Sequence, residues 1–162
     1  DYLYYFCIME KLNLPSVNFT CRTNADLKTE IFDPFRKKYV LLTPEEWVRQ
    51  HFAHFMTQAL LVPTSLMALE KKIIMNGLNR RFDIVVYSKE VTPLLIVECK
   101  AASVPISQAV FDQAARYNSV LKAPYLVVTN GLIHHACKID FIKANIEYLN
   151  SLPLYSEMIS HP

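Results

Sequence analysis

The chain has 162 residues, of which 52% are hydrophobic and 12% aromatic, enough apolar material for one domain with one core. The formal net charge of +2 permits nucleic-acid binding, but it is equally typical of an ordinary solvated surface. Only two glycines occur, so neither of the glycine-rich phosphate loops GxxxxGKS/T and GxGxxG can be written. An ATP-binding motor and a Rossmann dehydrogenase are therefore not expected in this chain.

Cysteine usage and hydropathy indicate the cellular compartment in which we expect the protein. The four cysteines are far apart and form no CxxC pair: Cys7, Cys21, Cys99 and Cys137. A structural zinc site is therefore not expected, and we interpret the cysteines as reduced thiols of a cytoplasmic protein. No apolar run approaches the roughly 20 residues of a membrane helix, so no membrane partner is expected.

The amino-terminal quarter is polar and mixed in composition. Residues 1–8 are interpreted as an upstream extension before Met9, and residues 1–42 as an extension and lead-in that packs on the core. Within this lead-in, residues 28–39 fit either a short hairpin or an extended segment. Residues 43–162 are expected to form the main part of what is a single domain overall.

A helix is predicted to begin after Thr43. Residues 43–46 (TPEE) form a capping box, in which Thr43 is the cap and Glu46 reaches back to the cap residue. We expect the helix to end near Leu61. Its apolar residues recur at helical spacing on one side: Val48, Phe52, Phe55, Met56 and Ala59.

The rest of the chain alternates between strand and helix patterns. The predicted elements, in order, are strands at 66–75, 81–87 and 94–99, a helix at 106–121, a strand at 125–129 and, after residue 132, a strand and a last helix. Asn76-Gly77 marks a turn between the first two strands, which makes the three strands a meander. This order predicts an α/β fold with a mixed central sheet flanked by helices.

Charged residues end the apolar strand at 94–99. Side chains alternate along a strand, so Glu98 and Lys100 share one face while Cys99 faces the other. Taken alone, this pattern fits a strand tip that runs out into solvent. Asp83, however, interrupts a second apolar strand. If the two strands pair, Asp83 and Glu98 approach each other, and two neighbouring carboxylates are ligands that Mg²⁺ uses. An Asp83–Lys100 ion pair with a structural role is the alternative.

Further polar residues surround this motif in the predicted fold. Gln113 and Tyr117 are one helical turn apart and therefore neighbours on the helix surface, although Tyr117 also fits the core. Glu70 is either a third acid or a surface residue in a charged patch. Arg80 and Arg81 fit phosphate contacts or a solvated face.

Two other groups have weaker patterns. Lys71-Lys72, like the arginine pair, flank the motif and fit phosphate contacts or a solvated face. His51 and His54 have a spacing that can bind a metal on a helix, but no third ligand is evident, so we expect surface or partly buried histidines.

The combination of Asp83, Glu98-x-Lys100 and Gln113-x-x-x-Tyr117 in this order of elements resembles the PD-(D/E)XK nuclease superfamily. Several segments are similar to the N-terminal domain family of type I restriction enzyme R proteins: TPEEWVRQHF, RRFDIVVY, LLIVECKA, FDQAARYN and YLVVTNG. The likeness covers most of the chain, from about residue 32 to 157.

The resemblance implies a restriction-endonuclease-like fold and a nuclease, dependent on Mg²⁺ or Mn²⁺, that hydrolyses phosphodiester bonds. Asp83 and Glu98 would bind the metal together with the backbone carbonyl of Cys99. Lys100 would orient the attacking water and stabilise charge in the transition state, and Glu70 would be an upstream acid that also reaches the metal.

The resemblance also implies partners. Gln113 and Tyr117 would support the site or touch the backbone of a nucleic acid, with DNA as the expected substrate. A homodimer and restriction–modification subunits are further candidate partners for what would be a bacterial protein. Because no ATP-binding motor is present in the sequence, the full restriction role is not carried over. The alternatives are a catalytically silent DNA-binding or protein-interaction module on the same fold, and a partner in a toxin–antitoxin-like pair.

Overall fold

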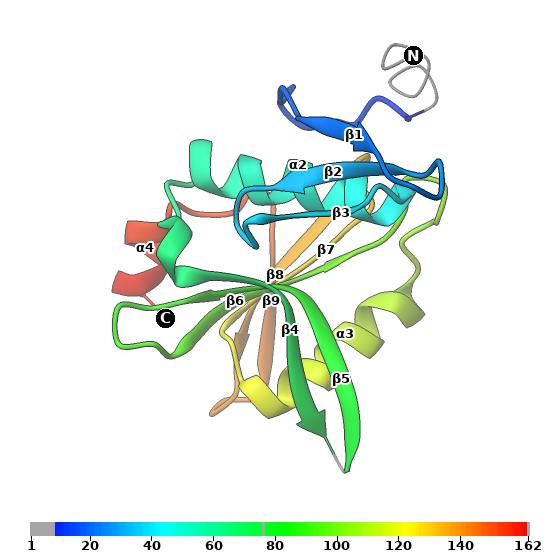
Figure 1. Ribbon diagram of the computed structural model, residues 1–162. Coiled ribbons are helices and arrows are strands. Elements are labelled where there is room, and N and C mark those ends of the chain that lie inside the picture. Colours follow the sequence, from blue (N-terminus) through cyan, green and yellow to red (C-terminus); the bar gives the residue numbers. More distant parts are fainter. Residues whose placement is uncertain (1–8, 76, 162) are drawn as a thin grey trace.

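The computed structural model describes residues 9–75 and 77–161 (Figure 1). Residues 1–8, interpreted above as an upstream extension, and Asn76 of the predicted turn lie outside the described residues. The elements in chain order are β1 (Cys21–Thr23), β2 (Thr29–Asp33), β3 (Lys38–Leu41), α2 (Pro44–Gln58), the short 3-10 helix η1 (Thr64–Leu66), β4 (Met67–Met75), β5 (Leu78–Tyr87), β6 (Pro93–Cys99), α3 (Gln108–Leu121), β7 (Tyr125–Thr129), β8 (His134–Asp140), β9 (Asn145–Leu149) and α4 (Tyr155–Ser160).

A six-stranded mixed sheet is the centre of the fold, and the predicted mixed α/β architecture is confirmed. Its strand order is β4-β5-β6-β7-β8-β9. Only the pair β6–β7 is parallel among these neighbours, since helix α3 connects the two strands as a crossover, and the other pairs are antiparallel. The predicted meander over residues 66–99 is present, and its first turn contains Gly77 in the left-handed region at φ +75°.

Hydrophobic residues cover both faces of this sheet, which explains the nearly continuous apolar runs of its central strands. On one face, Ile84 and Val97 belong to the cluster that contains Phe52 and Met56 of α2. The other face packs against α3, with a cluster formed by Val85, Ile96, Leu126, Phe111 and Ala114. Asp83 of β5 and the polar end of β6 are thereby held between two packed layers.

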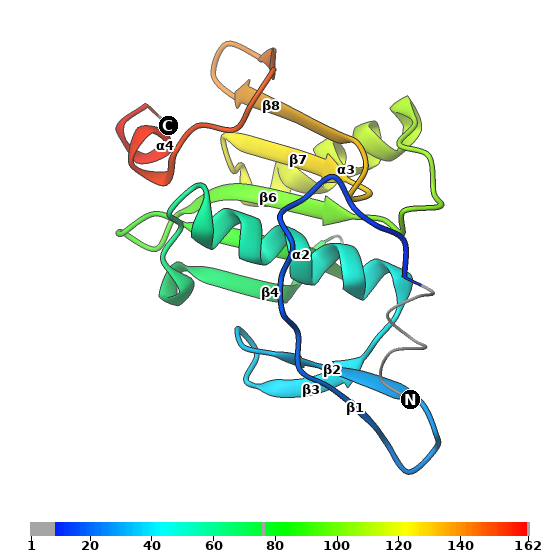
Figure 2. The same cartoon turned by 90° about the horizontal axis from the view of Figure 1, so that it is seen from above.

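A small antiparallel sheet, in the order β1-β2-β3, precedes α2. Residues 28–39 therefore form a hairpin, with Phe32 paired to Tyr39. Figures 1 and 2 place this sheet alongside α2, next to the β4 edge of the large sheet. Ile31 of β2 is fully buried in the same cluster as α2. The first half of α2 is consequently enclosed from two sides.

Helix α2 begins where the capping signal places it, because the Thr43 hydroxyl accepts a hydrogen bond from the Glu46 N–H at 3.1 Å. The helix ends at Gln58, a few residues before the expected Leu61, and Leu61 itself has a left-handed φ of 58°. The predicted stripe is buried at Val48, Phe52 and Met56, half-buried at Phe55 and exposed at Ala59.

The carboxyl-terminal part differs from the prediction by one strand. The prediction had a single strand before the last helix, whereas β8 and β9 form a hairpin followed by α4. Strand β9 has an exposed pattern over most of its length, so it lacks the apolar alternation by which strands are recognised. In residues 9–75 and 77–161, no helix has the length and apolarity to cross a membrane.

Candidate active site

The motif residues meet where β5 and β6 lie side by side. Ile84 pairs with Val97 in the antiparallel register, which brings the preceding Asp83 next to the end of β6. Lys100 donates from Nζ to Oε1 of Glu98 at 2.7 Å, so these two side chains lie on the same side of the chain. Their side chains are 24% and 19% exposed, which leaves both within reach of a substrate.

Asp83 is buried, and both oxygens of its carboxylate accept hydrogen bonds. Its Oδ2 accepts a hydrogen bond from the Cys99 N–H at 2.7 Å, while Oδ1 accepts two from Arg49, from Nη2 at 2.7 Å and from Nε at 3.2 Å. The alternative of an Asp83–Lys100 ion pair is not what the structure has, because Asp83 pairs with Arg49 and Lys100 with Glu98. Asp83 thus ties β5 both to β6 and to helix α2.

Two buried arginines organise the carboxylates around this point. We call the arginine network the set formed by Arg36, Arg49 and the acids that they bind: Asp33, Glu45, Glu46, Glu70 and Asp83. Arg36 is in the connection between β2 and β3, and its side chain is 10% exposed, against 4% for Arg49. Burial alone would lower the pKa of Arg49, but the charges of Asp83 and Glu46 outweigh it and raise the pKa.

Glu46 has a different role from the one predicted. Rather than reaching back to the cap residue, its carboxylate accepts hydrogen bonds from Arg36, Arg49 and Gln50. Neither arginine was among the predicted site residues. The only signal in the sequence was the presence of charged residues on the buried side of α2, where Arg49 follows Glu45 and Glu46 at helical spacing.

Glu70 interrupts the pairing of β4 with β5. The register joins Leu69 to Ile84 and Lys71 to Phe82 and passes over Glu70, which faces Asp83 between them. Glu70 has a φ of +54°, a left-handed conformation that costs a non-glycine residue about 1–2 kcal/mol. Such strain is typical of functional sites, where surrounding contacts hold a residue in place.

The Glu70 carboxylate is neutralised by arginines from three elements. It accepts from Arg36 at 2.5 Å and lies 3.0 Å from Arg81 and 3.7 Å from Arg49. Burial alone would raise the pKa of Glu70, but the three arginines lower it. Glu70 is therefore near Asp83 and fully paired, which makes it a weaker candidate for a metal ligand than Glu98.

The electrostatics of Glu98 favour a cation nearby. Burial raises the pKa of Glu98, the charge of Asp83 raises it further, and the hydrogen bond from Lys100 offsets only part of this effect. Burial would lower the pKa of Lys100, but its hydrogen bond with Glu98 and the charge of that residue raise it, so the ammonium stays protonated. A divalent cation between the two carboxylates would relieve their repulsion.

The donor set fits Mg²⁺ or Mn²⁺ in kind. Asp83, Glu98 and the Cys99 carbonyl are oxygen ligands, and Mg²⁺ commonly takes one or two carboxylates and completes its shell with water and phosphate oxygens. Asp83 accepts three hydrogen bonds of the about four that a carboxylate can accept, which leaves room for one further bond. Across the part of the chain that the structure describes, no three His, Cys, Asp or Glu side chains cluster closely enough to hold a metal by themselves.

The predicted accessory residues form a group on the α3 side. Gln113 donates from Nε2 to the Tyr117 hydroxyl at 3.3 Å, and the guanidinium of Arg80 lies 5.2 Å from the centre of the Tyr117 ring. The Nε of Arg80 is buried and has no hydrogen-bond partner. Tyr117 is half-buried against the apolar cluster under α3, and Gln113 is exposed. Within the described ranges, no contact joins this group to Asp83 or Glu98.

The histidines of α2 are packed instead of ligating. His51 and His54 contact the ring of Phe19 with centroid distances of 4.8 and 5.5 Å, and Trp47 also contacts His51 edge to face. Burial lowers the pKa of both histidines, which keeps them neutral. They join the amino-terminal segment to α2.

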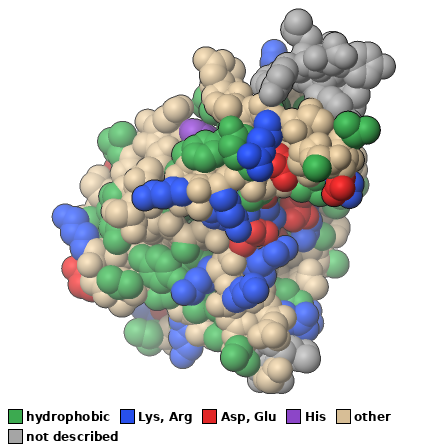
Figure 3. Space-filling model, viewed as in Figure 1, with side chains coloured by type: hydrophobic (Ala, Val, Ile, Leu, Met, Phe, Trp, Pro, Cys, Tyr) green, Lys and Arg blue, Asp and Glu red, His purple; other side chains and the backbone are tan. Residues whose placement is uncertain are grey.

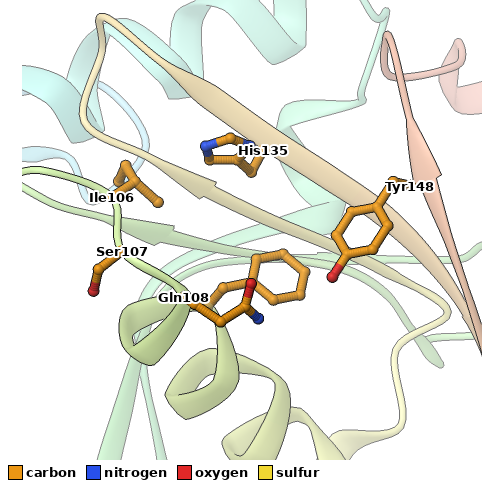
Figure 4. Close-up of a pocket in the computed structure, with 6 residues that line it drawn as sticks. Ile106, Ser107, Gln108, His135 and Tyr148 are labelled. Atoms are coloured by element: carbon orange, nitrogen blue, oxygen red, sulfur yellow. The ribbon is translucent and has the colours of Figure 1, made fainter.

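A pocket of about 210 Å³ opens at the start of α3 (Figure 4), but it contains none of the predicted residues. It is lined by Ile106, Ser107, Gln108, Phe111, His135 and Tyr148. Because this lining has no carboxylate, lysine or arginine, the pocket does not offer the predicted chemistry.

Known proteins are similar to this chain in sequence and fold. Residues 44–153 match the family described as the N terminus of type I restriction enzyme R protein (HSDR_N). Among solved structures, one fragment described as an HsdR subunit of a type I restriction enzyme from Vibrio vulnificus YJ016 is 18% identical, with a TM-score of 0.52. The match covers 74% of this chain and 25% of that one, and at this identity it shows the fold alone. No curated protein matches the chain.

Proposed function

Because the chain belongs to the family of type I restriction enzyme R protein N-terminal domains, we propose that it is a metal-dependent nuclease that hydrolyses phosphodiester bonds of DNA on a PD-(D/E)XK fold. The observation that carries this proposal is the position of buried Asp83, in the middle of β5, beside the Glu98–Lys100 pair at the end of β6. The family places the chain in the context of restriction and modification. The chain spans about a quarter of the HsdR chain that it matches, so partner subunits and a homodimer are equally proposals.

Asp83, Glu98 and the Cys99 carbonyl would hold the cation, and a bound Mg²⁺ or Mn²⁺ would polarise the phosphate and lower the pKa of a water. Arg49 and the Cys99 N–H fix the orientation of the Asp83 carboxylate. Lys100 contributes a permanent positive charge where negative charge builds on the phosphate in the transition state.

The remaining predicted residues take supporting roles in this proposal. Arg80, Gln113 and Tyr117 form one group on the α3 side, and they would contact the DNA backbone. Arg81 and Glu70 are joined by an ion pair and lie on the β4 side of the candidate site, where Arg81 would add positive charge near the DNA.

The test combines metal binding and cleavage. We expect the wild type to bind Mn²⁺ in a calorimetric titration and to cleave a DNA substrate when Mg²⁺ or Mn²⁺ is added. Glu98→Ala should lose both, and Asp83→Ala should lose cleavage. The matched control is Glu147→Ala, because Glu147 is an exposed acid on β9 far along the sheet from Glu98. Cleavage that survives in both Asp83→Ala and Glu98→Ala would rule the proposal out.

One observation favours the silent module as a second candidate. The Arg49 guanidinium already neutralises Asp83, so it supplies in the free protein part of the charge that a metal would bring. If wild-type protein binds DNA but does not cleave it with Mg²⁺, Mn²⁺ or both, the binding module is the better description.

A further inference from the structure

A basic pocket of about 490 Å³ lies between the amino-terminal sheet and the β4–β5 hairpin. Its lining comes from three places, the β2–β3 hairpin, β4 and β5: Arg36, Lys38, Leu69, Glu70, Lys72 and Arg81. Figure 3 shows Lys and Arg side chains gathered across this face, over β3 and the β4–β5 hairpin, with acidic side chains between them. Four of the six lining residues are cationic and one is anionic.

The positive charge of this basic pocket is only partly balanced by ion pairs, which involve its two arginines. Lys72 and Arg81 are directly opposite each other in the antiparallel register, an arrangement in which like charges destabilise a sheet. Glu70 binds Arg81 and Arg36, whereas Lys38 and Lys72 form no ion pair with any residue that the structure describes. An anionic ligand would remove this imbalance.

The basic pocket adjoins the candidate active site. Glu70 lines the pocket, faces Asp83 across the two strands, and approaches Arg49, the same arginine that binds Asp83. Glu70 and Arg49 therefore connect the lining of the pocket to Asp83. The volume greatly exceeds the roughly 30 Å³ that one water occupies in the liquid, so the pocket accepts more than a single small ion.

We propose that the basic pocket binds backbone phosphates of the DNA strand that enters the candidate active site, with Lys38 and Lys72 as the contacting residues. This inference rests on the proposed function and adds the path of the substrate to it. Arg36 and Lys38 precede residue 44, where the family match begins, so the match does not assign this wall. Lysine contacts to phosphate do not depend on the base sequence of the DNA, and the pocket therefore adds affinity without base specificity.

The experiment measures DNA binding without chemistry. A fluorescein-labelled DNA duplex is titrated with the 162-residue chain in EDTA, and its anisotropy gives Kd at salt concentrations from 50 to 200 mM. We compare wild type, Lys38→Ala, Lys72→Ala and the double variant. The matched control is Lys89→Ala, since Lys89 is an exposed lysine in the turn between β5 and β6, at the end of β6 opposite to Glu98.

Each lost phosphate contact should reduce the salt dependence. The logarithm of the binding constant falls with the logarithm of the salt concentration, with a slope of about −0.9 for each phosphate contact. Between 50 and 200 mM salt, wild type should therefore lose roughly 3.5-fold more affinity than each single variant and about 12-fold more than the double variant. Lys89→Ala should behave as wild type. Thermal unfolding of each variant confirms that the fold is kept.

The outcomes separate this inference from the nuclease proposal. A reduced salt slope in the two lysine variants supports the basic pocket even if no metal produces cleavage. An unchanged slope in the double variant overturns it, and so does wild-type protein that does not bind the duplex at 50 mM salt. If the double variant cleaves DNA as wild type does, the nuclease proposal stands and the proposed binding role of Lys38 and Lys72 is wrong.

Discussion

Replacement of Arg49 by alanine should be among the most damaging single changes in this chain. Its side chain is 4% exposed, and it binds Asp83 and Glu46, which are 6% and 4% exposed. Removing one partner of a buried ion pair leaves uncompensated charge and typically costs about 3–5 kcal/mol. Glu45, whose side chain is 43% exposed, adds little to this figure because solvent screens it.

That cost is a large part of the total stability, since a domain has a free energy of unfolding of only about 5–15 kcal/mol. For a chain of this size, it corresponds to a fall in Tm of roughly 6–20 °C. Arg49→Lys should recover only part of the loss, because an ammonium lacks the planar fork that binds both carboxylates.

Urea unfolding is the suitable assay, because Trp47 is the single tryptophan of the sequence and is buried in α2, two positions before Arg49. Arg22→Ala is the control, since Arg22 is half exposed and solvent screens its ion pair with Glu30, which should therefore contribute little to stability. A loss below about 1 kcal/mol in Arg49→Ala would refute the reasoning. If the cation site is real, saturating Mn²⁺ should stabilise Arg49→Ala more than wild type, because Asp83 then has no competing partner.

Two further predictions concern the packing of the core. Gly131→Ala should be more destabilising than Gly77→Ala in urea unfolding. Both glycines have a left-handed φ, in which an added side chain costs about 1–2 kcal/mol. Only at Gly131, however, would the new Cβ lie 2.7 Å from Leu12. Equal losses would show that Leu12 moves aside at no cost. Cys99 and Cys137 should not react with iodoacetamide at pH 8 before urea unfolds the chain, because both are buried. Burial raises the pKa of Cys137 to about 11 and that of Cys99 well above its usual value, which keeps both thiols protonated and unreactive. Peptide mass spectrometry identifies the labelled positions, and labelling in the folded protein would contradict this.

Local signals were sufficient for most of the large sheet and its helices. The start of α2 follows from four consecutive residues, and β6 follows from a run of apolar residues that only a doubly covered strand would have. Strand β9 was missed because its residues are exposed, and β1 because three residues carry no period. The β2–β3 hairpin was left open for a related reason, since its residues alternate only weakly between buried and exposed.

For the candidate site, the sequence indicated the carboxylates but not what surrounds them. Asp83 and Glu98 stand out because a charge within an apolar strand is unusual. Arg49 and Arg36 do not stand out, because their partners Asp83 and Glu70 are each 34 residues away along the chain. Such pairs have no periodicity, and only the packing of α2 between two sheets brings them together.

The ion pairs of Arg36 also determine where the chain could be truncated without loss of stability. Arg36 is in the amino-terminal hairpin, yet it binds Glu46 and Glu70 inside the region that homology defines. Trimming the chain to residues 44–153 would remove one of the arginines that bind Glu46 and Glu70, leaving Arg49 and Arg81 as their partners, and would uncover one side of α2. The region that the family match covers is thus smaller than the set of residues that these ion pairs connect, and its boundary at residue 44 crosses two of them.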